Sequence, residues 1–429
     1  MQIYNYPLFN TWPKILSRPA NNYSSINSTV RMILDNVKKK GDTAVRDYTR
    51  RFDGADLEEF RVSKDEMENA AQMIEPKLKE AIQKAAKNIL AFHEIQKPPM
   101  RMIETTPGVK CWQKSVPIDK VGLYIPGGSA PLFSTVLMLG IPAQIAGCKE
   151  IILCTPPNEK GEIHPAILFA AGLVEVSRIY KIGGVQAIGA MAYGTETVPR
   201  VYKIFGPGNS WVTAAKQIVS VNDCAIDMPA GPSELAIMAD ESANPEFIAA
   251  DLLSQAEHGP DSQVILVTTE EPLITKVLQA IDRQMSELPR AAIATKALEN
   301  SRAILVNDEE QMVELINFYA PEHLIIATRN TTNHADRITN AGSVFLGNFT
   351  PESAGDYASG TNHTLPTQGW ARSFSGLNLE SFCKKITFQE ISREGIQQLG
   401  PTIEAMAEGE LLFAHKNAAT LRINSSDES

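Results

Sequence analysis

From residue 121 onward the chain alternates short apolar runs, rich in valine and isoleucine, with segments long enough for a helix. Such runs are typical of strands buried on both faces, and helix-length connections join them as parallel neighbours through right-handed crossovers. The runs form two sets, at residues 122–125, 150–154, 176–182 and 202–205, and at residues 233–239, 263–268, 303–306, 324–328 and 343–347. The sequence therefore predicts an α/β fold with two Rossmann-like parallel-sheet modules and small N- and C-terminal extensions.

Helical and strand-like segments flank this alternating region. Residues 24–96 are predicted to be helical, with Ser28-Thr29-Val30 capping the first helix. Residues 75–92 place apolar side chains on one stripe at helical spacing: Leu78, Ile82, Ala85, Ile89 and Phe92. Beyond residue 375, a strand-like run at 385–388 is followed by helical stretches, which predicts an arm outside the core.

Charge, apolar runs and cysteines narrow the functional class. A net charge of −10, with no basic stripe interleaved with aromatic residues, argues against a nucleic-acid partner and favours a small molecule. The first 15 residues lack the pattern of a secretory signal, and no apolar run approaches the ~20 residues that cross a bilayer. The five cysteines form no C-x-x-C pair, and an odd number suits a reducing compartment. We therefore expect a cytoplasmic protein without membrane association.

Three glycine-rich turns follow predicted strands in the first module. They are Pro126-Gly127-Gly128, Gly183-Gly184-Val185-Gln186 and Gly206-Pro207-Gly208-Asn209. Backbone N–H groups at such turns can meet a phosphate, although none of the three is a complete G-x-G-x-x-G fingerprint. A single glycine turn is more often just a tight connection. Three at the same ends of neighbouring strands favour a ligand crevice.

Four of the seven histidines stand beside carboxylates, amides or glycine-rich loops. Asn244-Pro245 is a good helix start and Gly259-Pro260 a good stop, so Gln255 and His258 share a face of the last turn. Asp356 lies in a small-residue loop that can deliver one carboxylate to a cleft. Two histidines and an aspartate suit zinc, with the glutamine carbonyl as a weak fourth ligand. The alternative is that His258 only caps its helix.

Glu322-His323 is a candidate acid/base pair, placed directly after Pro321. Adjacent residues on a turn diverge, so the two side chains can serve different protons, one from a substrate hydroxyl and one from an attacking water. A solvated surface turn is the alternative.

The remaining histidines and the cysteines carry weaker signals. Cys111 and Cys148 border glycine-rich segments, so a cysteine nucleophile stays open as a less favoured alternative. Three histidines without obvious partners are predicted to be surface residues: His93, His164 and His334.

In the order and spacing of these segments the chain resembles the histidinol dehydrogenase family across nearly its full length. The resemblance rests on eight motifs, namely Tyr48-Thr-Arg-Arg-Phe-Asp53, Gly122-Leu-Tyr-Ile-Pro-Gly-Gly128, Gly183-Gly-Val-Gln-Ala187, Gly206-Pro-Gly-Asn209, Asp227-Met-Pro-Ala-Gly-Pro-Ser-Glu234, Leu253-Ser-Gln-Ala-Glu-His-Gly259, Ala320-Pro-Glu-His-Leu324, and Ser353-Ala-Gly-Asp356 through Asn362-His-Thr-Leu-Pro366. Any one of them could arise by chance, whereas their joint order makes the resemblance specific.

The resemblance implies oxidation of L-histidinol to L-histidine through the aldehyde, with two NAD+ reduced, in the final steps of histidine biosynthesis. It also implies one zinc ion (Zn2+) per subunit, held by Gln255, His258, Asp356 and His415. In the family the last of these ligands comes from the partner subunit, which implies a homodimer with two shared sites. Zinc would anchor the imidazole and amine of the substrate rather than polarise the reacting oxygen.

The resemblance also assigns roles to single residues. His323 would take the alcohol proton, and Glu322 would activate the water that attacks the aldehyde. NAD contacts are implied at Tyr124, Gln186 and Asn209. Substrate contacts are implied at Ser233, Gln255, His258, His323, Asp356, His363, Glu410 and His415, with Glu410 also supplied by the partner. One departure is Tyr202, where relatives commonly carry aspartate, which puts the local charge near the dinucleotide in doubt.

These roles predict a division of the chain into domains. Residues 1–23 form an N-terminal extension, 24–120 and 231–375 a discontinuous α/β substrate and zinc domain, 121–230 a Rossmann-like NAD-binding domain, and 376–429 a C-terminal dimerisation arm. Two rival functions are a zinc hydrolase with Glu322 as general base, and a non-catalytic protein stapled by a closed metal site. The glycine turns argue against the hydrolase, and the Glu322-His323 pair has no role in the stapled protein.

Overall fold

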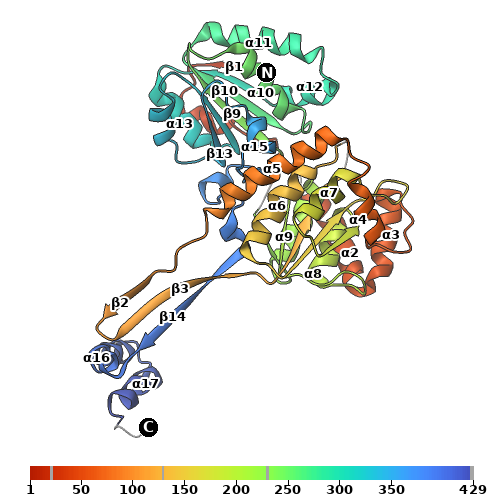
Figure 1. Ribbon diagram of the computed structural model, residues 1–429. Coiled ribbons are helices and arrows are strands. Elements are labelled where there is room, and N and C mark those ends of the chain that lie inside the picture. Colours follow the sequence, from red (N-terminus) through yellow and green to blue (C-terminus); the bar gives the residue numbers. More distant parts are fainter. Residues whose placement is uncertain (20–22, 128–129, 229–230, 426–429) are drawn as a thin grey trace.

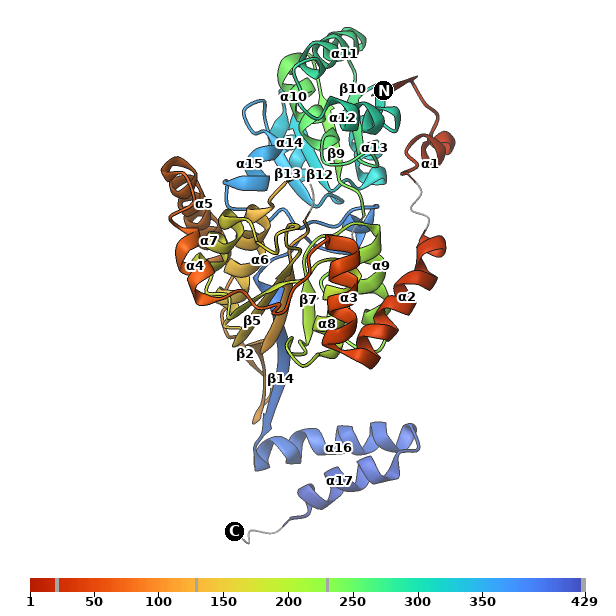
Figure 2. The same cartoon turned by 90° about the vertical axis from the view of Figure 1, so that its right-hand side faces the viewer.

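Two parallel sheets, each covered by helices, form the body of the protein, and a third, antiparallel sheet projects from it (Figures 1 and 2). The computed structural model describes residues 1–19, 23–127, 130–228 and 231–425. Within these residues no helix is both long and apolar enough to cross a bilayer. The predicted α/β class with two parallel-sheet modules is confirmed.

The first module has five parallel strands in the order β6-β5-β4-β7-β8. The strands are β4 (Lys120–Tyr124), β5 (Glu150–Thr155), β6 (Arg178–Lys181), β7 (Lys203–Phe205) and β8 (Ala225–Ile226). Two helices cover each face: α6 (Phe133–Ala146) and α7 (Pro165–Leu173) on one, α8 (Gly184–Tyr193) and α9 (Ser210–Ser220) on the other. The chain builds outward from β4 in one direction and then returns to its other side, so the strand order reverses between β4 and β7.

Four N-terminal helices thicken this module: α2 (Tyr23–Lys40), α3 (Asp42–Asp53), α4 (Lys64–Ala70) and α5 (Pro76–Glu94). Helices α2 and α3 pack on α8, whereas α4 and α5 pack on the α6 and α7 side. The predicted cap at residues 28–30 is wrong, because the first helix already begins at Tyr23 and Val30 is fully buried in its interior. In α5 the apolar stripe is buried at Ile82, Ala85 and Ile89.

The second module has six parallel strands in the order β1-β11-β10-β9-β12-β13. They are β1 (Gln2–Asn5), β9 (Glu234–Ala239), β10 (Gln263–Thr268), β11 (Arg302–Leu305), β12 (His323–Ala327) and β13 (Ser343–Leu346). Helices α10 (Pro245–Ala256), α11 (Glu271–Met285) and α12 (Ala291–Glu299) cover one face, and α1 (Trp12–Ile15) and α13 (Glu309–Tyr319) the other. Alternate residues of β9 enter the two cores, Leu235 and Ile237 on one side, Ala236 and Met238 on the other.

The projecting sheet has the order β14-β3-β2 and forms an arm. Its strands are β2 (Met102–Thr106), β3 (Val109–Pro117) and β14 (Cys383–Ile391), and β14 pairs with β3 along its whole length. Two helices, α16 (Arg393–Gly409) and α17 (Phe413–Ile423), stand at the far end of the arm, away from both modules (Figure 2). Short elements complete the fold: α14 (Thr331–Asp336), α15 (Glu352–Tyr357) and 3-10 turns at Phe9–Thr11, Trp370–Arg372 and Leu379–Phe382.

Every predicted strand is present, but four further strands were not predicted. They are β1 at the edge of the second sheet, the short β8, and the arm strands β2 and β3. The predicted boundaries between domains stay a prediction, because the two modules and the arm are interleaved in the sequence.

Candidate functional site

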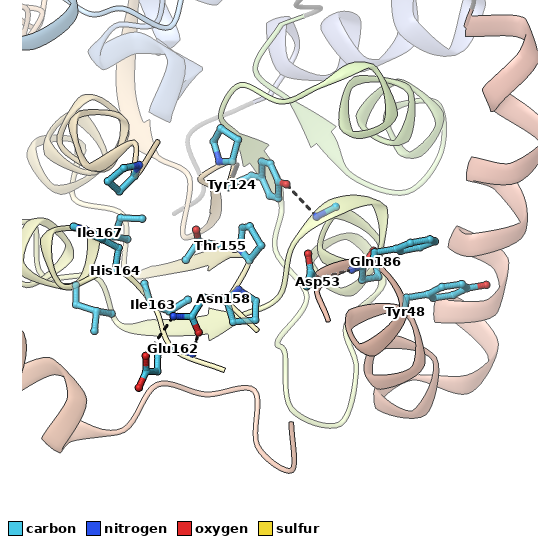
Figure 3. Close-up of a pocket in the computed structure, with 18 of the residues that line it drawn as sticks. Tyr48, Asp53, Tyr124, Thr155, Asn158, Glu162, Ile163, His164, Ile167 and Gln186 are labelled. Carbon is cyan, nitrogen blue, oxygen red and sulfur yellow. Dashed lines mark hydrogen bonds between the residues drawn. The ribbon is translucent and has the colours of Figure 1, made fainter. Parts of the chain in front are cut away.

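A cavity of about 1210 Å3 opens at the carboxyl ends of the first module's strands (Figure 3). Gly127 follows β4, Gly184 begins α8 after β6, and Asn209 precedes α9 after β7, and all three line its wall. The three glycine-rich turns therefore meet at one crevice, as their position after the strands predicted. Gly128 lies outside the described residues.

The three residues predicted to contact NAD all line this cavity. The Tyr124 hydroxyl accepts a hydrogen bond from the Gly184 N–H (3.0 Å), and Asn209 caps α9 by accepting from two backbone N–H groups of its first turn. Gln186 donates to Asp53 Oδ2 (3.3 Å), while Gln186 Oε1 is buried and has no hydrogen-bond partner among the described residues. A buried, unpartnered acceptor on a cavity wall is a place where a donor of a bound ligand fits.

The turn after β7 is held by a buried ion pair. Gly206 has a φ of +122°, and a Cβ there would lie 2.1 Å from the Tyr124 carbonyl oxygen, so only glycine fits. Its N–H donates to Asp227 Oδ2 (2.8 Å), and its carbonyl accepts from Lys216 Nζ (2.7 Å). Lys216 and Asp227 are themselves 2.5 Å apart and buried. The ion pair thus fixes both backbone groups of the turn.

Asp53 is a cavity residue that the sequence reasoning did not assign a role. It ends α3, and burial raises its pKa from 3.8 to about 6, against hydrogen bonds from Gly183 and Gln186. Its position at the end of the Tyr48–Asp53 motif, directly before the helix-terminating Gly54, is the signal that could have identified it.

The concern about Tyr202 is not supported. Tyr202 precedes β7, so it lies at the amino end of that strand, whereas the cavity lies at the carboxyl ends. Its side chain is 54% exposed and does not line the cavity. The departure therefore leaves the charge of the crevice unchanged.

The predicted acid/base pair lies at the amino end of β12 in the second module. Glu322 and His323 are 7% and 4% exposed, so the surface-turn alternative is wrong. Glu322 Oε2 accepts from the Glu234 N–H (2.8 Å), and His323 Nδ1 is 3.2 Å from the Glu234 carbonyl oxygen. Because a carbonyl only accepts, Nδ1 carries the hydrogen in this bond and Nε2 is left for other partners.

Three carboxylates surround the His323 ring. Nε2 is 3.7 Å from Asp356 Oδ1 and 3.8 Å from Glu352 Oε1, and Nδ1 is 3.6 Å from Glu322 Oε2. Burial opposes the charge on His323, but these acids outweigh burial and raise its pKa well above the ordinary value. Burial and the nearby Asp356 raise the pKa of Glu352 to about 8, whereas His323 and His363 hold the pKa of Asp356 low despite its burial.

The same acids form a group able to hold a metal ion. Ligand atoms of His258, Glu352 and Asp356 all lie within 4.8 Å of one another. Gln255 adjoins this group: with its amide oriented so that both ends are satisfied, Nε2 donates to Glu352 Oε1 (2.9 Å) and Oε1 accepts from the Glu234 N–H (3.2 Å). Turning this amide over sets its oxygen against the Glu352 carboxylate, an arrangement that a cation would stabilise.

Glu352 was missed by the sequence reasoning. It is four residues before Asp356, so α15 presents both carboxylates on one face, and this spacing could have identified it.

The helix start predicted at Asn244-Pro245 is confirmed, since Asn244 Oδ1 accepts from the Glu246 N–H (2.9 Å) and Pro245 is the first residue of α10.

His363 joins the two modules beside this group. Its Nδ1 donates to the Asp356 carbonyl (2.9 Å), and its Nε2 lies 3.1 Å from Thr135 Oγ1 on α6 of the first module. Burial lowers the pKa of His363, although Asp356 opposes this effect. Ser233, a predicted substrate contact, directly precedes β9, and its carbonyl accepts from the Gln263 N–H (3.1 Å). Both residues therefore lie near the acid cluster.

Two predicted site residues are far from this cluster in a single chain. Glu410 follows α16 and His415 lies on α17, both are exposed, and Figures 1 and 2 place these helices at the far end of the arm from α10 and α15. One chain thus brings together Gln255, His258 and Asp356 but not His415.

The expectation that His93 and His334 are surface residues is wrong, because both are fully buried with satisfied rings. His93 Nδ1 is 2.9 Å from the Ile89 carbonyl, and His334 lies between Thr328 Oγ1 (2.8 Å) and a Glu309 carboxylate oxygen (3.0 Å). His164 is exposed and lines the cavity.

Burial raises the pKa of Cys148 to about 12, which disfavours it as a nucleophile.

Comparisons with known proteins agree over both modules and the arm. A family model described as histidinol dehydrogenase matches residues 16–423. The histidinol dehydrogenase of Bacteroides thetaiotaomicron is 59% identical over 424 residues, which cover 99% of each chain. That of Escherichia coli K12 is 54% identical over 97% of this chain and 95% of its own. The crystal structure of histidinol dehydrogenase from Elizabethkingia anophelis superposes with a TM-score of 0.97 at 56% identity, covering 99% of this chain and 98% of that one.

Proposed function

The chain belongs to the histidinol dehydrogenase family, and on that premise we propose that it oxidises L-histidinol to L-histidine through L-histidinal, using NAD+. This four-electron oxidation would complete histidine biosynthesis in the cytoplasm and reduce two NAD+ per turnover. One observation carries the proposal: the second module holds a buried acid/base pair beside a metal-capable group, and the glycine turns of the first module line a large cavity.

Zinc is the metal that we propose for the group around Asp356, one ion per subunit. His258, Asp356 and Gln255 would bind it, and His415 of the partner subunit would complete the set. The support is the donor chemistry, since imidazole, carboxylate and amide oxygen are ligands that suit zinc, and the Gln255 oxygen can be turned toward the group. When bound, zinc would anchor the imidazole and amine of the substrate, which fixes the carbon to be oxidised.

NAD+ is the cofactor that we propose for the first module's cavity, with contacts at Tyr124, Gln186 and Asn209. The unpartnered Gln186 Oε1 supports this assignment, because a donor of the cofactor can satisfy it. The fixed turn at Gly206 supports it too, since backbone can approach a ligand closely only where no side chain intervenes. When bound, NAD+ takes up the two electrons released in each oxidation.

We assign the proton transfers to His323 and Glu322. In the first oxidation neutral His323 takes the hydroxyl proton of histidinol at Nε2, because Nδ1 is committed to the Glu234 carbonyl. With zinc bound to Asp356, the carboxylate charge that otherwise keeps this ring protonated would be offset. His323 then returns this proton to solvent. In the second oxidation Glu322 takes a proton from water as the water oxygen bonds to the aldehyde carbon, and the former carbonyl oxygen gains a proton from solvent, which gives the hydrate. His323 then takes one hydroxyl proton of the hydrate as its carbon gives up a hydride to the cofactor and becomes the carboxylic acid. Ser233 and His363 would contact polar groups of the bound substrate.

The proposed enzyme is a homodimer, because the predicted ligand His415 lies on the arm, far from its own chain's acid cluster. The test mixes two inactive variants, His415→Ala and His258→Ala, under conditions of subunit exchange. One of the two sites in a mixed dimer then has all its ligands, so up to about a quarter of the activity should return. Mixing His258→Ala with Asp356→Ala is the matched control, because neither site is then complete. No recovery in the first mixture, given proven subunit exchange, would contradict the shared site.

The main test measures NADH formed by the purified, zinc-loaded protein from L-histidinol. We expect two NADH for each L-histidine released, and NADH formation from L-histidinal as well. Replacing His323 by asparagine keeps a similar shape but removes the base, and should abolish both reactions. No NADH from histidinol with the zinc-loaded dimer would refute the proposed activity.

A further inference from the structure

A buried ion pair joins the N-terminal segment to the amino end of β9. Arg18 Nε is 2.6 Å from Glu234 Oε1, and Arg18 Nη2 is 2.9 Å from Glu234 Oε2, a bidentate geometry. The two side chains are only 14% and 1% exposed. Arg18 also donates to the carbonyl of Tyr319 (2.8 Å), and its guanidinium lies 4.1 Å from the centre of the Tyr319 ring. Lysine cannot fully replace arginine here, because only the planar guanidinium can bond to both carboxylate oxygens and stack on the aromatic ring.

Glu234 is also the residue whose backbone holds both members of the acid/base pair. Its N–H donates to Glu322 Oε2 (2.8 Å), and its carbonyl oxygen is 3.2 Å from His323 Nδ1. Its side chain accepts in addition from the Gln368 N–H (2.7 Å). One residue therefore bonds to both the Glu322 carboxylate and the His323 ring, and Arg18 holds its side chain together with the Gln368 N–H.

The segment that carries Arg18 is docked independently of this ion pair. Gln263 Nε2 donates to the Ser17 carbonyl (3.0 Å), and Arg302 Nε donates to the Ile15 carbonyl (3.1 Å). Gln263 begins β10, the neighbour of β9, and Arg302 begins β11, the next strand beyond β10, so the segment crosses the amino ends of three strands. This docking separates the effect of the ion pair from the attachment of the segment, since Arg302 attaches it without contacting Glu234.

We propose that Arg18 and Glu234 are positioning residues for both oxidation steps, a proposal that rests on the proposed function. Through the Glu234 backbone they hold His323 with Nδ1 bonded and Nε2 free, and they hold Glu322 where it can meet a water. Neither Arg18 nor the Glu234 side chain needs to touch the substrate. Because one residue orients both members of the pair, disturbing it should slow alcohol and aldehyde oxidation together, whereas a change in Glu322 alone should not.

The experiment compares Arg18→Met, Arg18→Lys and the double variant Arg18→Met/Glu234→Gln with the zinc-loaded wild type. Arg18→Met leaves a buried carboxylate unpaired and can fail to fold, and the double variant avoids this because it removes the charge on both sides. We expect kcat to fall on the order of 10- to 100-fold for both histidinol and histidinal, with zinc content and the KM for histidinol nearly unchanged. Arg18→Lys should keep an intermediate kcat. Arg302→Met, the matched control, should keep kcat within about twofold of wild type.

A spectroscopic measurement tests the same contact without turnover. In protein labelled with 15N-histidine, the hydrogen-bonded Nδ1–H of His323, assigned by its loss in His323→Asn, should move toward the signal of a solvent-bonded ring in the double variant and stay in Arg302→Met. An unchanged His323 signal, or a folded double variant with kcat within about twofold of wild type, would overturn the proposal. A kcat that falls only as zinc is lost would also overturn it. If wild type makes no NADH, the proposed function fails, whereas the His323 signal still reports on the ion pair.

Discussion

The two parallel-sheet modules share a strand order but use opposite ends of their strands. Apart from the edge strand β1 in the second module, each sheet starts from a central strand (β4 or β9), with the next two strands on one side and the following two on the other. The order therefore reverses between β4 and β7 in the first module and between β9 and β12 in the second. Ligands of such sheets usually bind at the carboxyl ends, at this reversal. The first module follows the rule with its cavity, whereas the second places Glu322 and His323 at the amino end of β12.

Loop chemistry explains the difference. The first module has glycine turns at its carboxyl ends, which leave backbone N–H groups able to meet a ligand. In the second module the loops after β9, β11 and β12 have no glycine, and Asp240 accepts from the N–H groups of Ser242 (2.9 Å) and Arg329 (2.7 Å) in the first and last of these loops. Topology therefore determines where a crevice can form, and the loop residues decide which end of the sheet stays open.

Removing zinc should produce the largest difference between the modules. We expect a chelator to lower histidinol oxidation by at least about 1000-fold, because the substrate loses its anchor, while NAD+ binding to the first module persists. Activity measured with and without chelator checks the loss of histidinol oxidation, and NADH fluorescence checks that the first module still binds the dinucleotide. Retained activity, or simultaneous loss of NADH binding, would show that the two modules do not differ in their need for zinc. Zinc added back should restore activity.

Glu322→Gln should separate the two oxidations within the second module. The amide cannot take a proton from water, so we expect histidinal oxidation to fall by about 100- to 1000-fold and histidinol oxidation to fall much less. Single-turnover measurements from each starting compound give the two rates. Glu309→Gln is the matched control, since Glu309 contacts His334 at the other end of the module and should leave both rates unchanged. Equal losses in Glu322→Gln would remove its assigned role in activating water.

The fold was predictable where a strand is buried on both faces. Runs such as 263–268 are wholly apolar apart from their ends, and β10 occupies the predicted range. The missed strands are those whose pairing partner is distant in sequence or whose burial is one-sided. Strand β1 pairs only with β11, some 300 residues later, and β2 is almost entirely exposed. Local sequence pattern cannot reveal such pairings, because the stabilising contact lies outside the segment.

Parts of the site were predictable for a similar reason. Glycine turns and the Glu322-His323 pair are local signals: the turns line the cavity and the pair is buried. Glu352, Asp53 and the Arg18–Glu234 contact depend on how distant segments fold together, with residues 216 positions apart in the last case. His93 and His334 were mistaken for surface residues because the fold, rather than a local charge pattern, brings them to their partners, a carbonyl for His93 and a hydroxyl and the Glu309 carboxylate for His334.

Lys216→Met tests whether the first module's ion pair serves the cofactor alone. Lys216 and Asp227 hold Gly206, as Arg18 and Glu234 hold the acid/base pair. We expect the KM for NAD+ to rise about tenfold with the KM for histidinol and the zinc content unchanged, and the free energy of unfolding to fall by about 3 kcal/mol. Lys203→Met is the control, because Lys203 begins β7, the strand that leads to Gly206, but bonds to the Ser381 carbonyl. Equal rises in both KM values would show that the modules are not separable.

The smallest expected effect is a pH dependence confined to the first module. Burial raises the pKa of Asp53 to about 6, above its ordinary value of 3.8, so the folded state holds this proton more tightly than the unfolded state. Folded stability should therefore fall as pH rises from about 4 to about 6, and Asp53→Asn should remove this part of the dependence.

Because solvent reaches part of the Asp53 carboxylate, we expect Asp53→Asn to be more stable than wild type by only about 1 kcal/mol at pH 7, with no gain near pH 4. Urea unfolding at several pH values measures the difference. Asp56→Asn is the control, since Asp56 is exposed, bonds to Arg50 and should show no such trend. A gain that is the same at every pH would mean that packing rather than the buried charge distinguishes the variant. A change in the KM for histidinol would mean that the second module senses this carboxylate as well.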